Sequence, residues 1–219
     1  MRLRSFIFPL LALSLAVPRL VASDHPLPPI QDASKYAAFD AHPDENTVIA
    51  AEPFDTKEKM KYFRVDYLKN YFMPIRIIVT NNGDKPVSLE QARIDFITAN
   101  GDRIPAAEPE DVERRMTHVS NTGHKVPMPA PIPPVGGKAK TPDGKIEQDF
   151  SEFEYSDITI PPHTSKAGFL FYDMQGLGGN PLRGAKLSFR KVQDGDGKQF
   201  FPYDIPFDKY LDTQKGSMQ

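Results

Sequence analysis

The chain of 219 residues contains no cysteine and no tryptophan. The absence of cysteine excludes disulfide bonds, thiolate metal sites and a cysteine nucleophile. The sequence also lacks an Asn-x-Ser/Thr acceptor site for N-linked glycosylation. Any folded domain of this sequence must therefore be held together without covalent cross-links.

Long apolar runs are scarce, and the longest one stands near the N-terminus. It is a 13-residue stretch at positions 5–17, which is short for a membrane span. Arg2 and Arg4 precede it, and the small residues Val21-Ala22-Ser23 follow it. This order of basic, apolar and small residues is typical of a secretory signal peptide. We therefore expect residues 1–23 to be cleaved, leaving a periplasmic or extracellular chain with no membrane span.

Positive charge is in slight deficit. The chain has 27 Lys and Arg residues against 29 Asp and Glu residues, a net charge of −2. Cleavage after residue 23 would remove three arginines and no acid, which leaves 24 basic residues and a net charge of −5. Such a chain lacks the basic excess of an electrostatic nucleic-acid binder.

If Arg19 and Leu20 prevent cleavage, the alternative to a signal peptide is an N-terminal anchor.

Proline is abundant, with 22 residues, and it separates the expected parts of the chain. The Pro-rich residues 24–46 lack apolar periodicity and are expected to lead into the domain. We expect a β-sandwich domain at 47–211, interrupted at 120–145 by a segment rich in Pro, Gly and Lys. A loop of this length is usually functional or disordered, so a flexible insertion is expected there. Residues 212–219 are expected to form a disordered tail.

The middle of the chain has the pattern of short β-strands. The clearest strand is Met73-Pro-Ile-Arg-Ile-Ile-Val-Thr80, and the Asn81-Asn-Gly-Asp84 that follows it is typical of a hairpin turn. We expect the returning strand within residues 87–98. Further apolar runs predict strands at 167–172, where both faces should be buried, and at 185–192.

Helices are expected only at the margins of these strands. Residues 108–116 have Pro at the first helical position, acids in the first turn and arginines near the end, as the helix dipole favours. Asp111 and Arg115 have the i,i+4 spacing of an ion pair. A shorter helix is expected after Asp55 as its N-cap. Six to eight strands with marginal helices predict an all-β sandwich, and the alternative is an α+β fold with the strands packed on the longer helix.

Two stretches resemble exported bacterial immunoglobulin-like domains. The string I-R-I-I-V-T-N-N-G-D-K-P-V-S-L at 75–89 resembles a strand ending in V-x-N-x-G, a proline and the next strand. The run I-P-P-H-T-S-K-A-G-F-L-F at 160–171 resembles the apolar strand that follows a loop in the same domains. The resemblance implies an immunoglobulin-like antiparallel β-sandwich in an envelope or secreted setting, with no catalytic residues. The whole chain also resembles uncharacterised secreted proteins of soil bacteria.

A stretch rich in aromatic and cationic residues at 59–72 is the first candidate binding site. Aromatic rings beside cations can bind sugars, peptides or anionic polymers. The alternative is an amphipathic segment whose rings pack into the core. The candidate contact residues are Tyr62, Arg64, Tyr67, Lys69 and Tyr71.

A second candidate site lies in the proline-rich half of the insertion. Residues 127–134 can present a preformed extended ligand to an aromatic groove, and the alternative is a plain loop. The candidate contact residues are Pro131, Pro133 and Lys138. The expected partners are an envelope protein, a peptide or a glycan.

No residue pattern predicts a catalytic mechanism. The sequence has no Gly-x-Ser-x-Gly motif and no Ser-x-x-Lys with its partner motifs. Asp194-Gly-Asp-Gly197 lacks the further ligands of a calcium loop and predicts a hairpin turn. We therefore expect a noncatalytic binding or structural module of the bacterial envelope, without cofactor or metal. The alternatives are a metal-dependent or hydrolytic enzyme using His118, His124 and nearby carboxylates, and an accessory subunit of an envelope assembly.

Overall fold

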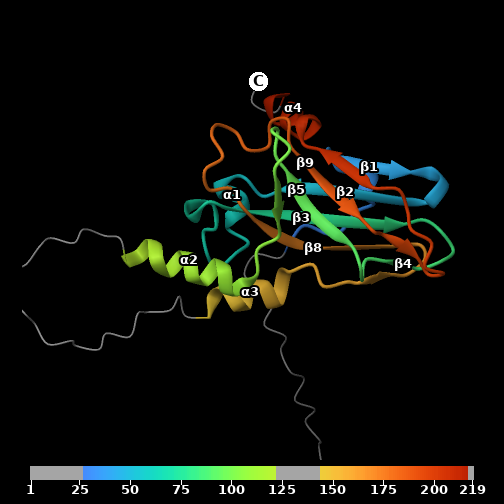
Figure 1. The fold of residues 1–219 in the computed structure, drawn as a ribbon, viewed down its shortest axis with the longest axis horizontal. Helices are drawn as coiled ribbons and strands as arrows, with labels where there is room; N and C mark the ends of the chain where they lie inside the picture. Colours follow the sequence, from blue (N-terminus) through green and yellow to red (C-terminus); the bar gives the residue numbers. More distant parts are fainter. Residues whose placement is uncertain (1–26, 122–143, 217–219) are drawn as a thin grey trace, which may run out of the picture.

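The computed structural model describes residues 27–121 and 144–216, which form a β-rich body with most of its helices at one end (Figure 1). Three antiparallel sheets supply most of the ordered structure. The helices of this part of the chain are short, and none of them is long and apolar enough to cross a membrane. The chain is thus mostly β, as the strand pattern predicts.

The first sheet, sheet A, runs through the middle of the molecule. Its strand order is β1-β2-β3-β8, and each neighbouring pair is antiparallel. The strands predicted at 73–80 and 167–172 are confirmed, and they lie side by side as β3 and β8. The strands of sheet A are β1 (Phe39–His42), β2 (Thr47–Pro53), β3 (Phe72–Asn81) and β8 (Thr164–Asp173).

Every residue of β3 is buried. Side chains alternate between the two faces of a strand, so Ile77 faces one side of sheet A while Arg76 and Ile78 face the other. Ile77 belongs to the main core, whereas Ile78 packs in a separate cluster with Ala33 and Ala50. Sheet A is therefore covered on both faces.

The second sheet, sheet C, covers one face of sheet A. Its antiparallel strand order is β11-β9-β5-β6. Ile77 of sheet A packs with Phe96 and Leu187 of sheet C in the main core, which lies between the two sheets. The strands of sheet C are β5 (Arg93–Ile97), β6 (Arg103–Pro105), β9 (Lys186–Arg190) and β11 (Tyr203–Pro206).

The third sheet, sheet B, is small and has the order β10-β4-β7. The hairpin predicted at 81–84 is wrong, because β4 pairs with β7 and β10 instead of β3. Asn81 Oδ1 accepts the Gly83 N–H (2.9 Å), and Asn81 Nδ2 donates to the Ile160 carbonyl (3.1 Å). The turn thus carries the chain from sheet A into sheet B. The strands of sheet B are β4 (Val87–Ser88), β7 (Thr159–Ile160) and β10 (Gln193–Asp194).

The hairpin turn predicted at 194–197 is confirmed. The Gly197 N–H donates to the Asp194 carbonyl (2.9 Å), and Gly197 has a φ of 82°, which glycine adopts without strain. Gln193 and Gln199 form an antiparallel bridge on either side of the turn. The chain therefore reverses direction here, as its Asp-Gly pattern indicates.

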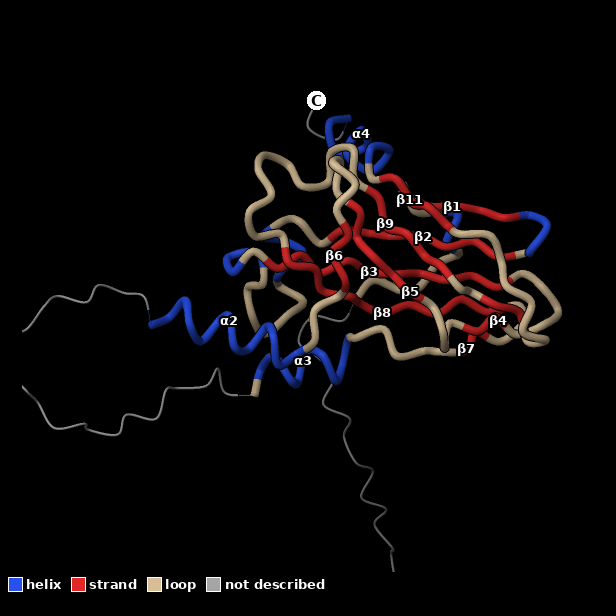
Figure 2. The backbone as a smooth tube through the Cα atoms, in the orientation of Figure 1, coloured by secondary structure: helices blue, strands red, loops and turns tan. Residues whose placement is uncertain are grey.

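Three helices lie at one end of sheet A, on the face opposite sheet C (Figure 2). Phe169 and Phe171 of β8 contact them, whereas Tyr172 points into the main core. In α3, Ile146 and Phe150 are buried one helical turn apart, which explains why this segment does not alternate like a strand. The helices and 3-10 turns are η1 (Ala33–Lys35), η2 (Pro43–Glu45), α1 (Lys57–Met60), η3 (Leu68–Asn70), α2 (Pro109–Asn121), α3 (Lys145–Phe153) and α4 (Asp208–Gly216).

Helix α2 confirms the helix predicted from residue 108 onward and begins at the expected proline. The ion pair predicted between Asp111 and Arg115 is wrong. Arg115 pairs with Asp173 of β8 (2.5 Å), and Asp111 pairs with Arg114 (2.5 Å). A carboxylate on the neighbouring strand is therefore preferred to the one within the helix.

The described residues shift the expected boundaries of the domain. Strand β1 lies within 24–46, the region expected only to lead into the domain, and it pairs with β2. Helix α2 extends into the insertion expected at 120–145, and α3 begins within it, while residues 122–143 lie outside the described residues. Helix α4 continues through Gly216, beyond the expected end of the domain at residue 211. The described structure thus extends beyond the expected domain at both ends.

Side-chain contacts connect β1 of sheet A with β11 of sheet C. Asp40 Oδ2 accepts a hydrogen bond from the Asp204 N–H (2.9 Å). Glu45, which follows β1 in η2, accepts from the Phe201 N–H (2.8 Å) and the Tyr203 hydroxyl (2.9 Å). The two strands belong to different sheets, and these carboxylates hold their edges together.

We predict that Glu45→Gln weakens the fold more at neutral pH than in acid. Burial alone would raise the pKa of Glu45, but hydrogen bonds from Phe201, His42 and Tyr203 lower it below its ordinary value. Such a carboxylate stabilises the folded state above its unfolded-state pKa, and this contribution is lost as the pH falls through the lowered folded-state pKa. Urea unfolding of both proteins at about pH 6 and about pH 3 should show a difference in unfolding free energy that shrinks in acid. A difference that stays constant would contradict this role of Glu45.

Candidate functional site

The aromatic stretch at 59–72 runs from α1 through η3 to β3, and its central rings are buried. The Phe63 ring lies 5.1 Å from Phe169, and the Tyr67 ring lies 4.7 Å from Phe171, measured between centroids. Burying a ring of this size contributes about 1.5–3 kcal/mol. The alternative in which the rings pack into the core therefore holds for Phe63 and Tyr67.

The five contact residues predicted in this stretch do not share one surface. Tyr67 is fully buried, so its prediction as a contact residue is wrong. Tyr62 is partly buried, whereas Arg64 and Lys69 are exposed. Tyr71 has 60% of its surface exposed, so among these five it alone presents an aromatic ring to solvent.

An ion pair between the exposed Arg64 and the buried Asp149 connects the same stretch to α3. Asp149 is fully buried, and its Oδ1 accepts a hydrogen bond from the Arg64 guanidinium (2.9 Å). Its Oδ2 accepts from the Arg64 N–H (3.0 Å) and from the Tyr67 hydroxyl (3.2 Å). Glu152 binds the second nitrogen of the Arg64 guanidinium (2.5 Å). We call Asp149, Arg64 and Tyr67 the clasp.

The clasp shifts the pKa values of its members. Burial raises the pKa of Asp149, and the hydrogen bonds from Arg64 and Tyr67 oppose this only in part. Burial and the neighbouring Asp149 carboxylate raise the pKa of Tyr67, so its hydroxyl keeps the proton that it donates. Hydrogen bonds to Asp149 and Glu152 raise the pKa of Arg64. These shifts follow from packing and pairing, which makes the clasp a structural feature.

Asp149→Ala should lower the free energy of unfolding by about 2–4 kcal/mol, because it leaves the Tyr67 hydroxyl and the Arg64 N–H without their acceptor. Glu152→Ala is the matched control, since it removes an exposed partner of the same guanidinium and should cost less than about 1 kcal/mol. Chemical denaturation of both variants measures the two losses. Equal losses would show that the clasp is no stronger than a surface ion pair.

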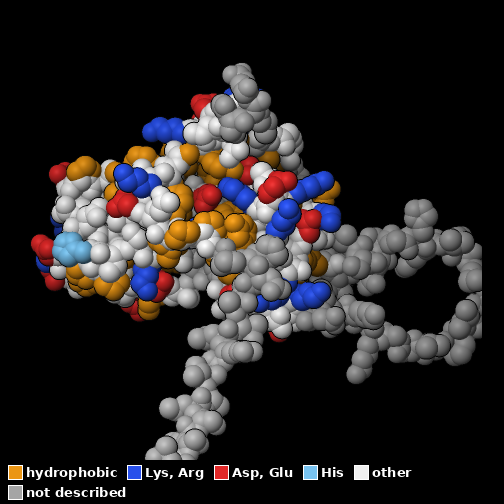
Figure 3. Space-filling view, turned by 180° about the vertical axis from the view of Figure 1, so that it is seen from behind, with side chains coloured by type: hydrophobic (Ala, Val, Ile, Leu, Met, Phe, Trp, Pro, Cys, Tyr) orange, Lys and Arg blue, Asp and Glu red, His pale blue; other side chains and the backbone are white. Residues whose placement is uncertain are grey.

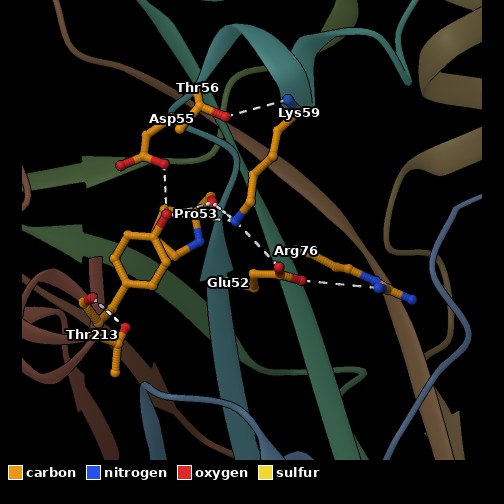
Figure 4. Close-up of polar contacts among 8 residues, drawn as sticks. Glu52, Pro53, Asp55, Thr56, Lys59, Arg76 and Thr213 are labelled. Carbon is orange, nitrogen blue, oxygen red and sulfur yellow. Dashed lines mark hydrogen bonds and ion pairs between the residues drawn. The ribbon is translucent and has the colours of Figure 1, made fainter. Parts of the chain in front are cut away.

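A second polar network connects α1 with β2 and β3 (Figure 4). Lys59 Nζ donates to Glu52 Oε1 (3.2 Å) and to the Pro53 carbonyl (2.7 Å). The other oxygen of Glu52 lies 3.9 Å from Nη1 of Arg76. Glu52 is therefore shared between two basic side chains.

The N-cap role predicted for Asp55 is wrong. Thr56 caps α1, since its Oγ1 accepts the Lys59 N–H (3.3 Å). Asp55 Oδ1 instead accepts a hydrogen bond from the Tyr210 hydroxyl (2.6 Å). This carboxylate therefore connects the start of α1 with α4.

A surface cleft of about 450 Å³ lies between β6 and α2. Asp173 Oδ2 lies 2.5 Å from Arg115 Nη2, and Gln175 Oε1 accepts from Arg115 Nη1 (2.8 Å). The same guanidinium stands 5.2 Å from the centroid of the Phe72 ring. These contacts fix the guanidinium group of Arg115 in the wall of the cleft. Phe72 and Asp173 also line the cleft, together with Ile104, Pro105, Ala106, Ala107, Asp111 and Arg114.

Tyr71 precedes Phe72, which lines this cleft, and Tyr71 is not itself a lining residue. Its φ of 63° lies in the left-handed region, which is costly for a bulky residue. Its carbonyl accepts the Met174 N–H (2.7 Å), which holds the backbone in place. Strained residues of this kind are concentrated at functional sites. The cleft, together with the exposed ring and strained backbone of Tyr71 one residue before its lining, defines our candidate site.

We expect Tyr71→Gly to raise the free energy of unfolding by up to about 1 kcal/mol. Glycine relieves the strain of a positive φ, and little packing is lost because the ring is exposed. Tyr71→Ala keeps the strain and is the matched control, for which no gain is expected. Thermal denaturation compares the two. A loss of stability in Tyr71→Gly would show that the ring is needed for packing.

Several predicted residues lie outside the part of the chain that the structure describes. They are Pro131, Pro133, Lys138 and His124. His118 belongs to α2. Among the described residues, no group of three or more His, Asp or Glu side chains is arranged to hold a metal ion.

The residues that line the cleft could not be predicted from the sequence. Arg115 has an acid four residues before it, so its pattern predicts a partner within the helix. Asp173 ends an apolar strand and carries no motif. The two meet only because α2 lies beside the end of β8, a contact between distant parts of the chain. None of the residues that line the cleft is among the predicted contact residues, and Tyr71 only precedes the lining residue Phe72.

Charges of both signs are mixed over the surface. On the face shown in Figure 3, Lys and Arg side chains lie among Asp and Glu side chains. Exposed pairs such as Lys186 with Asp204 (2.6 Å) neutralise each other locally. This face therefore offers no broad basic surface of the kind that binds nucleic acids.

Comparisons with protein-family models, curated proteins and solved structures find no match for this chain. A fold alone does not define a function. The functional argument therefore rests on the geometry of the candidate site.

Proposed function

We propose that the chain is a noncatalytic binding module of the bacterial envelope that takes up an extended peptide in the cleft beside β6. The observation that carries this proposal is the cleft itself, whose lining includes Phe72, the residue that follows the exposed and strained Tyr71. A volume of about 450 Å³ is in the range of small binding sites. Arg115, fixed by Asp173 and Gln175, supplies an oriented hydrogen-bond donor in the wall.

The edge of sheet C favours a peptide over a glycan. Strand β6 is the last strand in the order of sheet C, and Ile104 and Pro105 from it line the cleft. A terminal strand can accept a further strand from a partner through main-chain hydrogen bonds. Arg114 and Arg115 of α2 reach the same cleft and can bind carbonyl or carboxylate oxygens of such a peptide.

The proposed fold is an immunoglobulin-like β-sandwich. Two four-stranded antiparallel sheets around one core support it. The turn at 81–84 passes from one sheet to another, as connections in such sandwiches do. The sequence resemblance at 75–89 and 160–171 points to the same class.

The proposed location is the periplasm or the extracellular medium. It rests on the sequence of residues 1–23, whose basic, apolar and small-residue order is that of a signal peptide. These residues lie outside the described part of the chain. An envelope setting fits a module that recognises peptide segments of other exported proteins.

The test is capture of partners from an envelope extract by the mature chain, residues 24–219. Tyr71→Ala and Arg115→Ala should each reduce the recovered partner by about tenfold or more, because aromatic and arginine anchors carry most of the energy in such sites. Treating the extract with protease should abolish capture, whereas treating it with glycosidases should not. Quantitative mass spectrometry measures the recovery.

Phe201→Ala is the matched control for this experiment. Phe201 is an exposed aromatic residue, with 78% of its surface accessible, and its N–H is bound to Glu45 at the β1 end of the molecule. The Phe201→Ala variant should capture as much partner as the unaltered chain. Capture that is insensitive to Tyr71 and Arg115, or that resists protease, would overturn the proposal.

A further inference from the structure

A second cavity lies on the face of sheet A opposite sheet C. It has no lining residue in common with the cleft beside β6. Its volume is about 470 Å³, within the roughly 300–1,000 Å³ of small-ligand sites. Residues 27–30 form one part of its wall, and the end of α3 with Glu154, Ser156 and Asp157 forms another. Arg76 of β3 and residues 167–169 of β8 also line it.

Arg76 is the buried charged group of this cavity, with a side chain that is only 3% exposed. Its Nη2 donates to the Pro28 carbonyl (2.8 Å). Its Nη1 lies 3.9 Å from Glu52 Oε2 and has no hydrogen-bond partner among the described residues. Glu52 is shared with Lys59 (3.2 Å), so it compensates Arg76 only in part. Buried guanidinium groups normally satisfy their N–H donors, so an acceptor oxygen held in the cavity would complete the bonding of Arg76.

Carboxylates line another part of the same cavity. Glu152 and Asp157 are each paired with a basic side chain. Glu154 also lines the cavity, and it has no ion pair with a basic side chain among the described residues. Burial and the like charges of Glu108 and Glu110 raise the pKa of Glu154. A positive group held near Glu154 would relieve this repulsion.

We propose that this cavity binds a small zwitterion of the α-amino-acid type, with its carboxylate at Arg76 and its ammonium group at Glu154. A simple anion would face the carboxylates of the cavity, and a simple cation would face the buried guanidinium. A zwitterion places each of its charges beside the opposite one. Ile30, Ala167 and Phe169 line the cavity as well and offer apolar contact to a side chain of the ligand.

Three probes separate the two halves of this proposal. They are L-leucine, L-leucine methyl ester, which lacks the carboxylate, and N-acetyl-L-leucine, which lacks the ammonium group. Calorimetric titration of the mature chain with each probe up to about 10 mM detects even millimolar binding. Leucine should bind, and each derivative should bind about tenfold or more weakly, because it loses one charge-assisted hydrogen bond.

Glu154→Gln should weaken the binding of leucine about tenfold and leave the affinity for N-acetyl-L-leucine unchanged. Glu147→Gln is the matched control, because Glu147 is exposed on α3, the helix that ends just before Glu154, and does not line the cavity. Arg76→Lys should weaken the binding of leucine and leave the affinity for the methyl ester unchanged, provided that the melting curve of this variant shows a folded protein. Glu154 is exposed, so its variant tests the proposal even if Arg76→Lys does not fold.

Three outcomes would overturn the proposal. They are the absence of leucine binding, equal binding of all three probes, and unchanged leucine affinity in Glu154→Gln. Tyr71 and Arg115 do not line this cavity, so partner capture can fail while leucine binds, and the reverse can also occur. The two proposals are therefore tested separately.

Discussion

The burial of β3 on both faces is the constraint on which the rest of the structure depends. A strand of this kind needs a cover on each side, and its ten residues are all buried. Sheet C supplies one cover through the core around Ile77. The other cover is assembled from pieces, namely the helices at one end and the segment around Ala33 at the other. The clasp holds part of this second cover in place, because Asp149 connects α3 with the stretch before β3.

The same constraint explains where the candidate site lies. In the stretch at 59–72, the rings of Phe63 and Tyr67 pack in the cluster that covers this face of β3. The chain must then turn sharply to enter β3, and Tyr71 takes up the turn with a positive φ. Its ring is left in solvent, one residue before Phe72 of the cleft lining. The strained residue is thus a product of the way in which the sheet is covered.

Both cavities lie where separate covering elements meet incompletely. The cleft beside β6 lies between sheet C and α2, and the second cavity lies between residues 27–30 and the end of α3. Each contains an arginine, but their surroundings differ. Arg115 is held by two oxygen acceptors and is partly exposed, which suits a reversible surface contact. Arg76 is buried, and its Nη1 has no hydrogen-bond partner among the described residues, which suits a ligand with an acceptor oxygen.

The amino-acid sequence by itself determined several of the strands and the longer helix, because alternation, apolar runs and a helix-starting proline are local signals. It thus predicted β3, β8, α2 and the turn at 194–197, and it placed Tyr71 among the contact residues. Only the tertiary structure decided that the turn at 81–84 leads into another sheet, that Tyr67 is buried, and that Arg115 binds Asp173. These outcomes depend on the competition between partners far apart in the chain. A local pattern shows which groups need a partner, but the packing of distant segments determines which partner each group receives.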